Sequence, residues 1–211
     1  MIRLTKTACP AVLTQNAAAW TAVIVQKTAA GQEPTAADKS HYRHVDIKEA
    51  LVAETYGKCA YCESKLRHIT YGDVEHIIPK KLDPKLYYMW ANLTLACDIC
   101  NTNKGVREDI IDPYTEEPND HLLFSGPSLF PHPESDLGFV SENTLELNRA
   151  ELLERRIERL RKILMLVKSS KNTSTPAVKA IIEQDLVSNE CADGAEYAGC
   201  VRALLRQLGI I

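Results

Sequence analysis

The chain has 211 residues, of which 45% are hydrophobic and 25% are charged. These values are ordinary for a globular protein that can bury a core without disulfide support. The net charge of −3 excludes a uniformly basic surface that binds nucleic acid non-specifically, but it does not exclude a local basic patch.

The first quarter of the chain is predicted to be helical. Residues 11–30 are rich in alanine and predict one helix, and residues 39–56 predict a second. On this second helix His41 and His44 lie three positions apart. That spacing can bind a metal, but it more often marks a solvated helix face.

Between residues 59 and 107 the pattern changes to short elements and contains four cysteines. The apolar residues within 74–78 predict a strand that leads to a turn at Pro79, and residues 90–96 predict a second short strand. A helix is expected to open over residues 101–105.

The C-terminal part returns to a helical pattern. A proline-rich irregular stretch comes first, with a short strand expected at residues 138–140, and Asn143 is then expected to cap a long helix. The apolar positions of that helix step by three and four and are Ala150, Leu153, Ile157, Leu160, Leu164 and Val167. Such a seam packs on the helix's own domain more often than on a partner. Shorter helices are expected over residues 176–188 and 196–208.

Seven cysteines are an odd count. We recognise no secretory signal and no membrane span, so a cytoplasmic location with reduced thiols is expected. Two C-x-x-C pairs can supply the four thiolates of a closed tetrahedral zinc site, with a redox dithiol or buried cysteines as alternatives. These four residues are Cys59, Cys62, Cys97 and Cys100. The other three are expected to be ordinary buried thiols, and they are Cys9, Cys191 and Cys200.

Polar residues with catalytic character lie between and just after the cysteine pairs. Glu75 and His76 are adjacent, so in a strand they point to opposite faces and can serve one site only at a bend or a strand end. Asn92 lies in the second predicted strand. Asn101 and Lys104 follow the second cysteine pair directly.

The order and spacing of these motifs resemble the HNH endonuclease family. The resemblance covers residues 58–107 and implies a ββα-metal fold, in which a hairpin and a helix surround one catalytic divalent ion beside a structural zinc. It also implies hydrolysis of phosphodiester bonds in DNA, with 5′-phosphate and 3′-hydroxyl products. By position, His76 corresponds to the general base that takes a proton from the attacking water, a role that suits imidazole.

The resemblance also implies roles for the other motif positions. Glu75 and Asn101 correspond to ligands of the catalytic ion, and this oxygen-only set favours Mg²⁺ or Mn²⁺. Asn92 corresponds to the residue that supports the loop and orients the histidine, and Lys104 to a basic residue that can hold a phosphate. Seven basic residues against five acidic ones in residues 59–107 fit a nucleic-acid surface, although a plain solvated face gives the same count.

Motifs beyond the core resemble one HNH subgroup, the PtuB family of nuclease subunits in Septu anti-phage systems. These motifs are Asp112-Pro113, Glu117-Pro118, His121-Leu122-Leu123-Phe124 and Leu147-Asn148-Arg149 with Leu153 and Arg156. The resemblance implies that a PtuA-like ATPase of the ABC/SMC class gates the nuclease, in some systems together with a retron. The alternatives are an RNA or tRNA substrate, a stand-alone restriction or homing nuclease, and a zinc-stabilised nucleic-acid-binding adaptor without catalysis.

The sequence therefore predicts an α+β chain that is predominantly helical. We expect an N-terminal helical segment over residues 1–57 and an HNH core over residues 58–110. An irregular connecting segment is expected over residues 111–142, and a C-terminal helical segment over residues 143–211.

Overall fold

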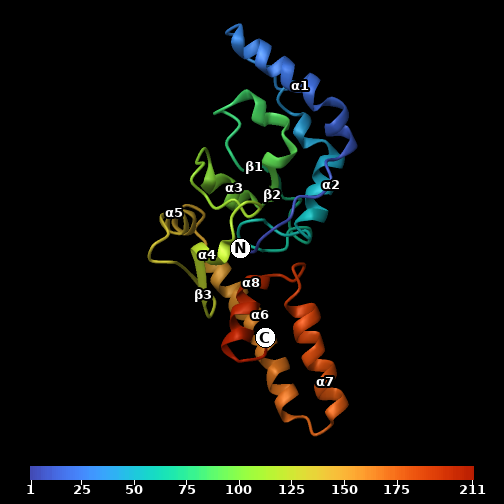
Figure 1. Ribbon diagram of the computed structural model, residues 1–211, viewed down its shortest axis with the longest axis vertical. Helices are drawn as coiled ribbons and strands as arrows, with labels where there is room; N and C mark the ends of the chain where they lie inside the picture. Colours follow the sequence, from blue (N-terminus) through green and yellow to red (C-terminus); the bar gives the residue numbers. More distant parts are fainter.

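The chain folds into a small ββα unit with helical segments at both ends of an elongated molecule (Figure 1). The computed structural model describes residues 1–211. The prediction of a mainly helical α+β chain is confirmed. Among its helices, none has the length and apolarity that crossing a membrane requires.

The N-terminal segment contains one long helix and a divided second one. Helix α1 spans Ala11–Ala29, as predicted. The second predicted helix is split into the 3₁₀ turn η1, His41–Arg43, and helix α2, Val45–Glu54. The split occurs at His44, because its backbone is extended (φ −54°, ψ 141°) and its ring nitrogen Nδ1 accepts a hydrogen bond from the Asp46 amide.

The central ββα unit has the predicted order. Strand β1, Asp73–His76, pairs antiparallel with β2, Leu93–Ala96, and helix α3, Asp98–Lys104, follows directly. Two 3₁₀ turns lie in the connection between the strands and span Pro84–Tyr88 (η2) and Trp90–Asn92 (η3). All four residues of β2 are buried, and α2 packs against this strand. The hairpin is therefore held between the N-terminal segment and α3.

The connecting segment is more regular than its sequence predicts. It contains the short helix α4, Pro118–His121, and an antiparallel hairpin of β3, Leu122–Ser125, and β4, Ser128–Pro131. The side chain of Asn148 fixes the hairpin from outside, because its Oδ1 accepts from the Leu129 amide and its Nδ2 donates to the Leu129 carbonyl.

The strand predicted at residues 138–140 is wrong, and helix α5, Asp136–Thr144, occupies that position. The Oγ of Ser135 accepts a hydrogen bond from the Gly138 amide at 2.9 Å and so caps the first turn. Gly138 is required by close packing, since a Cβ there would lie 2.2 Å from the His121 carbonyl oxygen. Gly138 therefore lies inside a helix, although glycine usually disfavours helices, because its neighbour leaves no room for a Cβ atom.

The C-terminal segment consists of helices α6, Ala150–Asn172, α7, Pro176–Asp185, and α8, Ala198–Gln207, with a π turn at Leu186–Glu190. The two shorter helices were predicted, but Asn143 lies within α5 and does not cap α6. The buried face of α6 is formed by Leu152, Arg156, Leu160, Ile163, Val167 and Ser170.

The predicted apolar seam of α6 is therefore only partly correct. Leu160 and Val167 are buried, whereas Leu164 is 44% exposed. The difference arises at Arg156, because its Nη1 donates to the carbonyls of Leu147 and Pro127, at 2.8 and 3.1 Å, beneath the helix. A charged residue whose Nη1 has two carbonyl acceptors can occupy a core position that an apolar pattern does not reveal, although the buried Nε of Arg156 has no hydrogen-bond partner.

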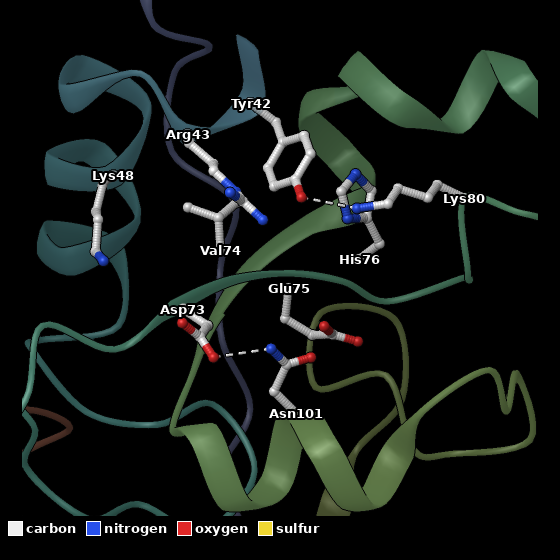
Figure 2. A pocket seen from close by; sticks show the side chains of 9 residues that line it. All are labelled: Tyr42, Arg43, Lys48, Asp73, Val74, Glu75, His76, Lys80 and Asn101. Atoms are coloured by element: carbon white, nitrogen blue, oxygen red, sulfur yellow. Dashed lines mark hydrogen bonds between the residues drawn. The ribbon is translucent and has the colours of Figure 1, made fainter. Parts of the chain in front are cut away.

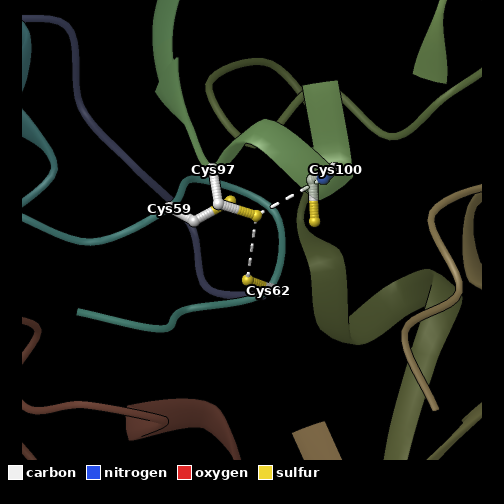
Figure 3. A group of neighbouring side chains, drawn as sticks. All are labelled: Cys59, Cys62, Cys97 and Cys100. Carbon is white, nitrogen blue, oxygen red and sulfur yellow. Dashed lines mark hydrogen bonds between the residues drawn. The ribbon is translucent and has the colours of Figure 1, made fainter. Parts of the chain in front are cut away.

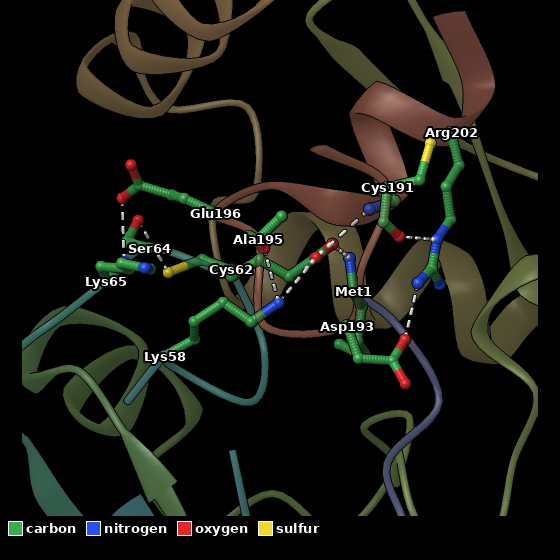
Figure 4. Close-up of polar contacts among 12 residues, drawn as sticks. Met1, Lys58, Cys62, Ser64, Lys65, Cys191, Asp193, Ala195, Glu196 and Arg202 are labelled. Carbon is green, nitrogen blue, oxygen red and sulfur yellow. Dashed lines mark hydrogen bonds and ion pairs between the residues drawn. The ribbon is translucent and has the colours of Figure 1, made fainter. Parts of the chain in front are cut away.

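The two ends of the chain meet at the first cysteine pair (Figure 4). The Lys58 ammonium donates to the Ala195 carbonyl at 3.0 Å, and the Lys65 amide donates to the Glu196 carboxylate at 2.9 Å. The carboxylate of Glu63 accepts from the amino group of Met1 at 2.8 Å. One cluster of 26 buried apolar residues consequently runs from the N-terminal residues through the ββα unit to α8.

Candidate active site and zinc centre

A polar cavity of about 300 Å³ opens beside the end of β1 (Figure 2). It is lined by Tyr42, Arg43, Lys48, Asp73, Val74, Glu75, His76, Lys80 and Asn101. Glu75 and His76 both contribute although they are neighbours, because His76 is the last residue of β1. The strand end therefore lets both side chains line the same cavity, as expected from the sequence for one site.

His76 is buried, with 5% of its surface exposed, and its orientation is fixed. Its Nε2 lies 3.1 Å from the Tyr87 carbonyl oxygen. Because a carbonyl can only accept, Nε2 carries the hydrogen and the lone pair of the neutral ring is on Nδ1. The ring of Tyr42 packs edge-on against the imidazole with the ring centres 4.7 Å apart.

The protonation state of His76 follows from its surroundings. Burial, and then the positive charges of Lys80 and Lys104, lower the pKa of His76 to about 3. A group with this pKa is neutral at physiological pH, so its Nδ1 lone pair carries no proton, and the same low pKa makes it a weaker base than a free imidazole.

Asn92 lies outside the cavity and closes the loop that follows β1. Its Oδ1 accepts from the Ile78 amide at 2.8 Å and its Nδ2 donates to the Ile78 carbonyl at 2.9 Å. The side chain is 4% exposed, so water does not compete for these bonds. Asn92 therefore fixes the backbone two residues after His76, where it cannot contact a substrate.

Three oxygen-bearing side chains lie below His76 and come from β1 and α3. The Nδ2 of Asn101 donates to the Asp73 carboxylate at 2.9 Å, and its Oδ1 is turned toward the side on which Glu75 lies (Figure 2). Carboxylate and amide oxygens form the donor set that Mg²⁺ and Mn²⁺ prefer. The residues present therefore fit a hard divalent cation, with Asp73 as a member that the sequence did not single out.

Lys104 does not occupy the position that the sequence predicts for it. Its side chain is 1% exposed, and its ammonium donates at 2.9 Å both to Glu75 Oε1 and to the His76 carbonyl. A buried amine with these two partners does not face a phosphate, so the predicted phosphate contact is corrected to a contact beneath the strand. Burial raises the pKa of Glu75, and the charge of Lys104 opposes that rise.

The cations that do line the cavity come partly from outside the predicted core. Arg43 and Lys48 belong to η1 and α2, whereas Lys80 follows β1. Tyr42 holds the Lys80 ammonium in place. The ammonium donates a hydrogen bond to the phenol oxygen at 2.8 Å and lies 4.1 Å from the centre of the ring. No motif in residues 39–56 marks Arg43 or Lys48; Lys48 is brought to the site by the packing of α2 on β2, and Arg43 by the packing of η1 on α2 and η2.

The four paired cysteines meet in one cluster (Figure 3). Their sulfurs all lie within 4.8 Å of one another, and Sγ of Cys62 is 3.9 Å from Sγ of Cys97. Zinc–sulfur bonds of about 2.3 Å in a tetrahedron place sulfurs about 3.8 Å apart. All four residues are buried, and the cluster could hold a zinc ion. The two C-x-x-C pairs thus converge on one point, as a four-thiolate zinc site requires.

Arg149, from the motif that follows the core, lies against the cysteine cluster. Its two terminal nitrogens are 3.9 Å from Sγ of Cys100, and Nη2 is 4.0 Å from Sγ of Cys97. With zinc bound, a guanidinium at this position would balance part of the negative charge of the four thiolates. Of the three unpaired cysteines, Cys191 and Cys200 are buried and Cys9 is half-buried.

Comparison with known proteins identifies the same central region. Residues 59–107 match the family model described as HNH endonuclease. The Septu protein PtuB of Bacillus thuringiensis is 40% identical over 81 residues, which cover 36% of this chain and 32% of that protein. The Septu protein PtuB of Bacillus mycoides (strain KBAB4) is 27% identical over 150 residues, or 54% of this chain and 51% of that protein. The matches thus span a third to a half of the length of these relatives.

These similarities confirm the resemblance to the HNH endonucleases and to PtuB proteins that the sequence motifs indicate. The range that matches the HNH endonuclease model, residues 59–107, contains the cysteine cluster and the three motif residues Glu75, His76 and Asn101.

Proposed function

We propose that the protein is a metal-dependent endonuclease that hydrolyses phosphodiester bonds of DNA as the nuclease of a Septu-type anti-phage complex. The observation that carries this proposal is His76, a buried neutral imidazole whose Nε2 is held by a carbonyl and whose cavity also contains Glu75 and Asn101. The HNH endonuclease match over residues 59–107 supports the same chemistry.

His76 acts as the general base. With Nε2 occupied by the Tyr87 carbonyl, Nδ1 takes the proton from the water that attacks the phosphorus atom. Asn92 acts indirectly, because the loop that it closes begins directly after the histidine. The rigid placement of the base contributes to the rate, since an imidazole that must reorient is a poor acceptor.

Glu75 and Asn101 hold the catalytic cation, with Asp73 beside Asn101. The chemistry that Mg²⁺ or Mn²⁺ supplies when bound is stabilisation of the negative charge that develops on the phosphate and on the leaving 3′ oxygen. Among the protein groups, the ammonium of Lys104 opposes the rise that burial causes in the pKa of Glu75 and so favours its ionised form. The cysteine cluster with zinc is structural and keeps α3 and the first cysteine pair together.

The assignment to anti-phage defence rests on the two PtuB relatives. We propose a PtuA-like ATPase as the partner that gates cleavage in the cytoplasm, with the helical regions outside residues 58–110 as docking surfaces. The identity with the Bacillus mycoides protein over 150 residues supports this, since that match extends beyond the 49 residues of the HNH domain.

The test is cleavage of plasmid DNA and of tRNA by the purified protein in Mg²⁺ or Mn²⁺, with and without the ATPase partner. His76→Ala is expected to reduce cleavage at least 100-fold, the usual contribution of a general base, without loss of zinc or fold. His68→Ala is the matched control, because His68 is an exposed histidine in the same domain. If the protein cleaves tRNA but not plasmid DNA, its substrate is RNA. Binding without cleavage in every condition would favour the adaptor.

A further inference from the structure

The cavity at the end of β1 has walls of opposite charge. One wall carries Asp73, Glu75 and Asn101, which come from the hairpin and α3. The other carries Arg43 and Lys48, which come from η1 and α2, and Figure 2 shows both on the side of the cavity opposite Lys80. The HNH domain match begins at residue 59, so this second wall lies outside it.

The cations of this wall are free to bind an anion. Neither Arg43 nor Lys48 forms an ion pair with a carboxylate of the chain. Arg43 is exposed and its guanidinium carbon lies 5.6 Å from the centre of the Tyr42 ring. Lys48 is half-buried and its ammonium contacts a neutral partner, the Gly72 carbonyl. By contrast, the ammonium of Lys104 is already paired with the Glu75 carboxylate and the His76 carbonyl.

We infer that Arg43 and Lys48 bind phosphates of the nucleic-acid backbone next to the cleaved bond, so that the N-terminal segment completes the active site. This inference rests on the proposed nuclease function. The planar fork of Arg43 suits a phosphate with two oxygens in reach, and Lys48 supplies a point charge. Together they provide the phosphate contact that the sequence predicted for Lys104, which is buried.

The geometry explains why these contacts come from so far away in the sequence. α2 packs on β2, and Lys48 reaches over to the carbonyl of Gly72, the residue immediately before β1. The base and the metal-binding oxygens are thus on the HNH domain, whereas the backbone of the substrate is held from η1 and α2.

The experiment measures binding of a fluorescent 20-base-pair DNA duplex by the full-length His76→Ala protein without divalent ions, over a range of salt concentrations. Arg43→Gln and Lys48→Gln are each expected to weaken binding about 5- to 20-fold and to reduce the salt slope by about 1, the value for one lost phosphate contact. Arg43→Lys should retain the slope. Arg155→Gln and Lys179→Gln on α6 and α7 are matched controls, since both residues are exposed.

An unchanged affinity and slope in the Arg43 and Lys48 variants would overturn the inference, as would a parent protein that binds neither DNA nor RNA at low salt. The outcome is separate from that of the proposed function. If the wild-type protein cleaves DNA while the slopes do not change, only this inference fails. If the slopes fall but no condition gives cleavage, the phosphate contacts stand and the nuclease proposal fails.

Discussion

Lys104 and Glu75 form a buried ion pair beneath the candidate active site, with Nζ 2.9 Å from Oε1 and the lysine side chain 1% exposed. The pair joins the last residue of α3 to the third residue of β1. It therefore links the two parts of the ββα unit and also places a positive charge on a proposed metal ligand.

Lys104→Met is expected to destabilise the protein strongly. Removing one partner leaves the Glu75 carboxylate buried without a counter-charge, which costs about 3 kcal/mol in comparable pairs. Urea unfolding at neutral pH measures the change. The double variant Lys104→Met with Glu75→Gln is expected to recover most of the loss, because it removes both charges. Lys81→Met, at an exposed lysine, is the control. Equal stability of the Lys104 variant and this control would contradict a structural role for the pair.

Asn92→Ala is expected to lower the cleavage rate without greatly changing the affinity for the substrate. The substitution removes both hydrogen bonds to the backbone of Ile78, which also destabilises the protein by about 1 kcal/mol for each lost bond. Single-turnover cleavage, measured beside duplex binding in the absence of divalent ions, separates the two effects. A loss of binding as large as the loss of rate would place Asn92 at the substrate and not behind the loop.

The sequence predicted the candidate site better than the molecule around it, and the reason is physical. His76, Glu75 and Asn101 lie in or next to short elements whose order is set by local pattern and by two cysteine pairs. Lys48 reaches the same cavity because α2 packs on β2, and Arg43 reaches it from η1, which packs on α2 and η2; no local pattern reports either contact. Lys104 had the right position in the sequence, but its burial depends on which face α3 turns to the hairpin.

Outside the site, two predictions from the sequence were wrong in whole or in part: the strand at residues 138–140 and the apolar seam of α6. In each, one residue adopts a position that its local sequence does not favour. Gly138 suggested an irregular strand, but the capping bond from its amide to Ser135 and its contact with His121 place it in a helix. On α6 the buried face shifted because Arg156 takes a core position, which left Leu164 44% exposed. In each case tertiary hydrogen bonds outweighed propensity.

Arg149→Gln is expected to accelerate the loss of zinc from the cysteine cluster. The guanidinium contacts Cys97 and Cys100, so its removal leaves thiolate charge uncompensated. Loss of such an outer contact typically lowers metal affinity 10- to 100-fold. The rate of zinc transfer to a coloured chelator measures the effect without any assay of cleavage. Arg149→Lys should be intermediate and Arg155→Gln unchanged. Equal release rates for wild type and Arg149→Gln would show that the arginine only packs against the cluster.

The buried state of His76 predicts how stability depends on pH. Its pKa is about 3 in the folded protein, against an ordinary value near 6.5 in the unfolded chain. Between these values the unfolded chain binds the extra proton, so stability is fully present above about pH 6.5 and falls as the pH drops toward 3. The loss between pH 7.5 and pH 5.5 from this one group is on the order of 1 kcal/mol.

His76→Gln isolates this contribution, because the glutamine amide can still donate to the Tyr87 carbonyl but does not titrate. Urea unfolding of both proteins at pH 7.5 and 5.5, without added divalent ions, gives four free energies of unfolding. On acidification the wild type is expected to lose about 1 kcal/mol more stability than His76→Gln. Parallel losses in the two proteins would mean that the imidazole is already solvated in the folded state. A solvated imidazole would be free to reorient, and the fixed Nδ1 lone pair on which the proposed base depends would be lost with it.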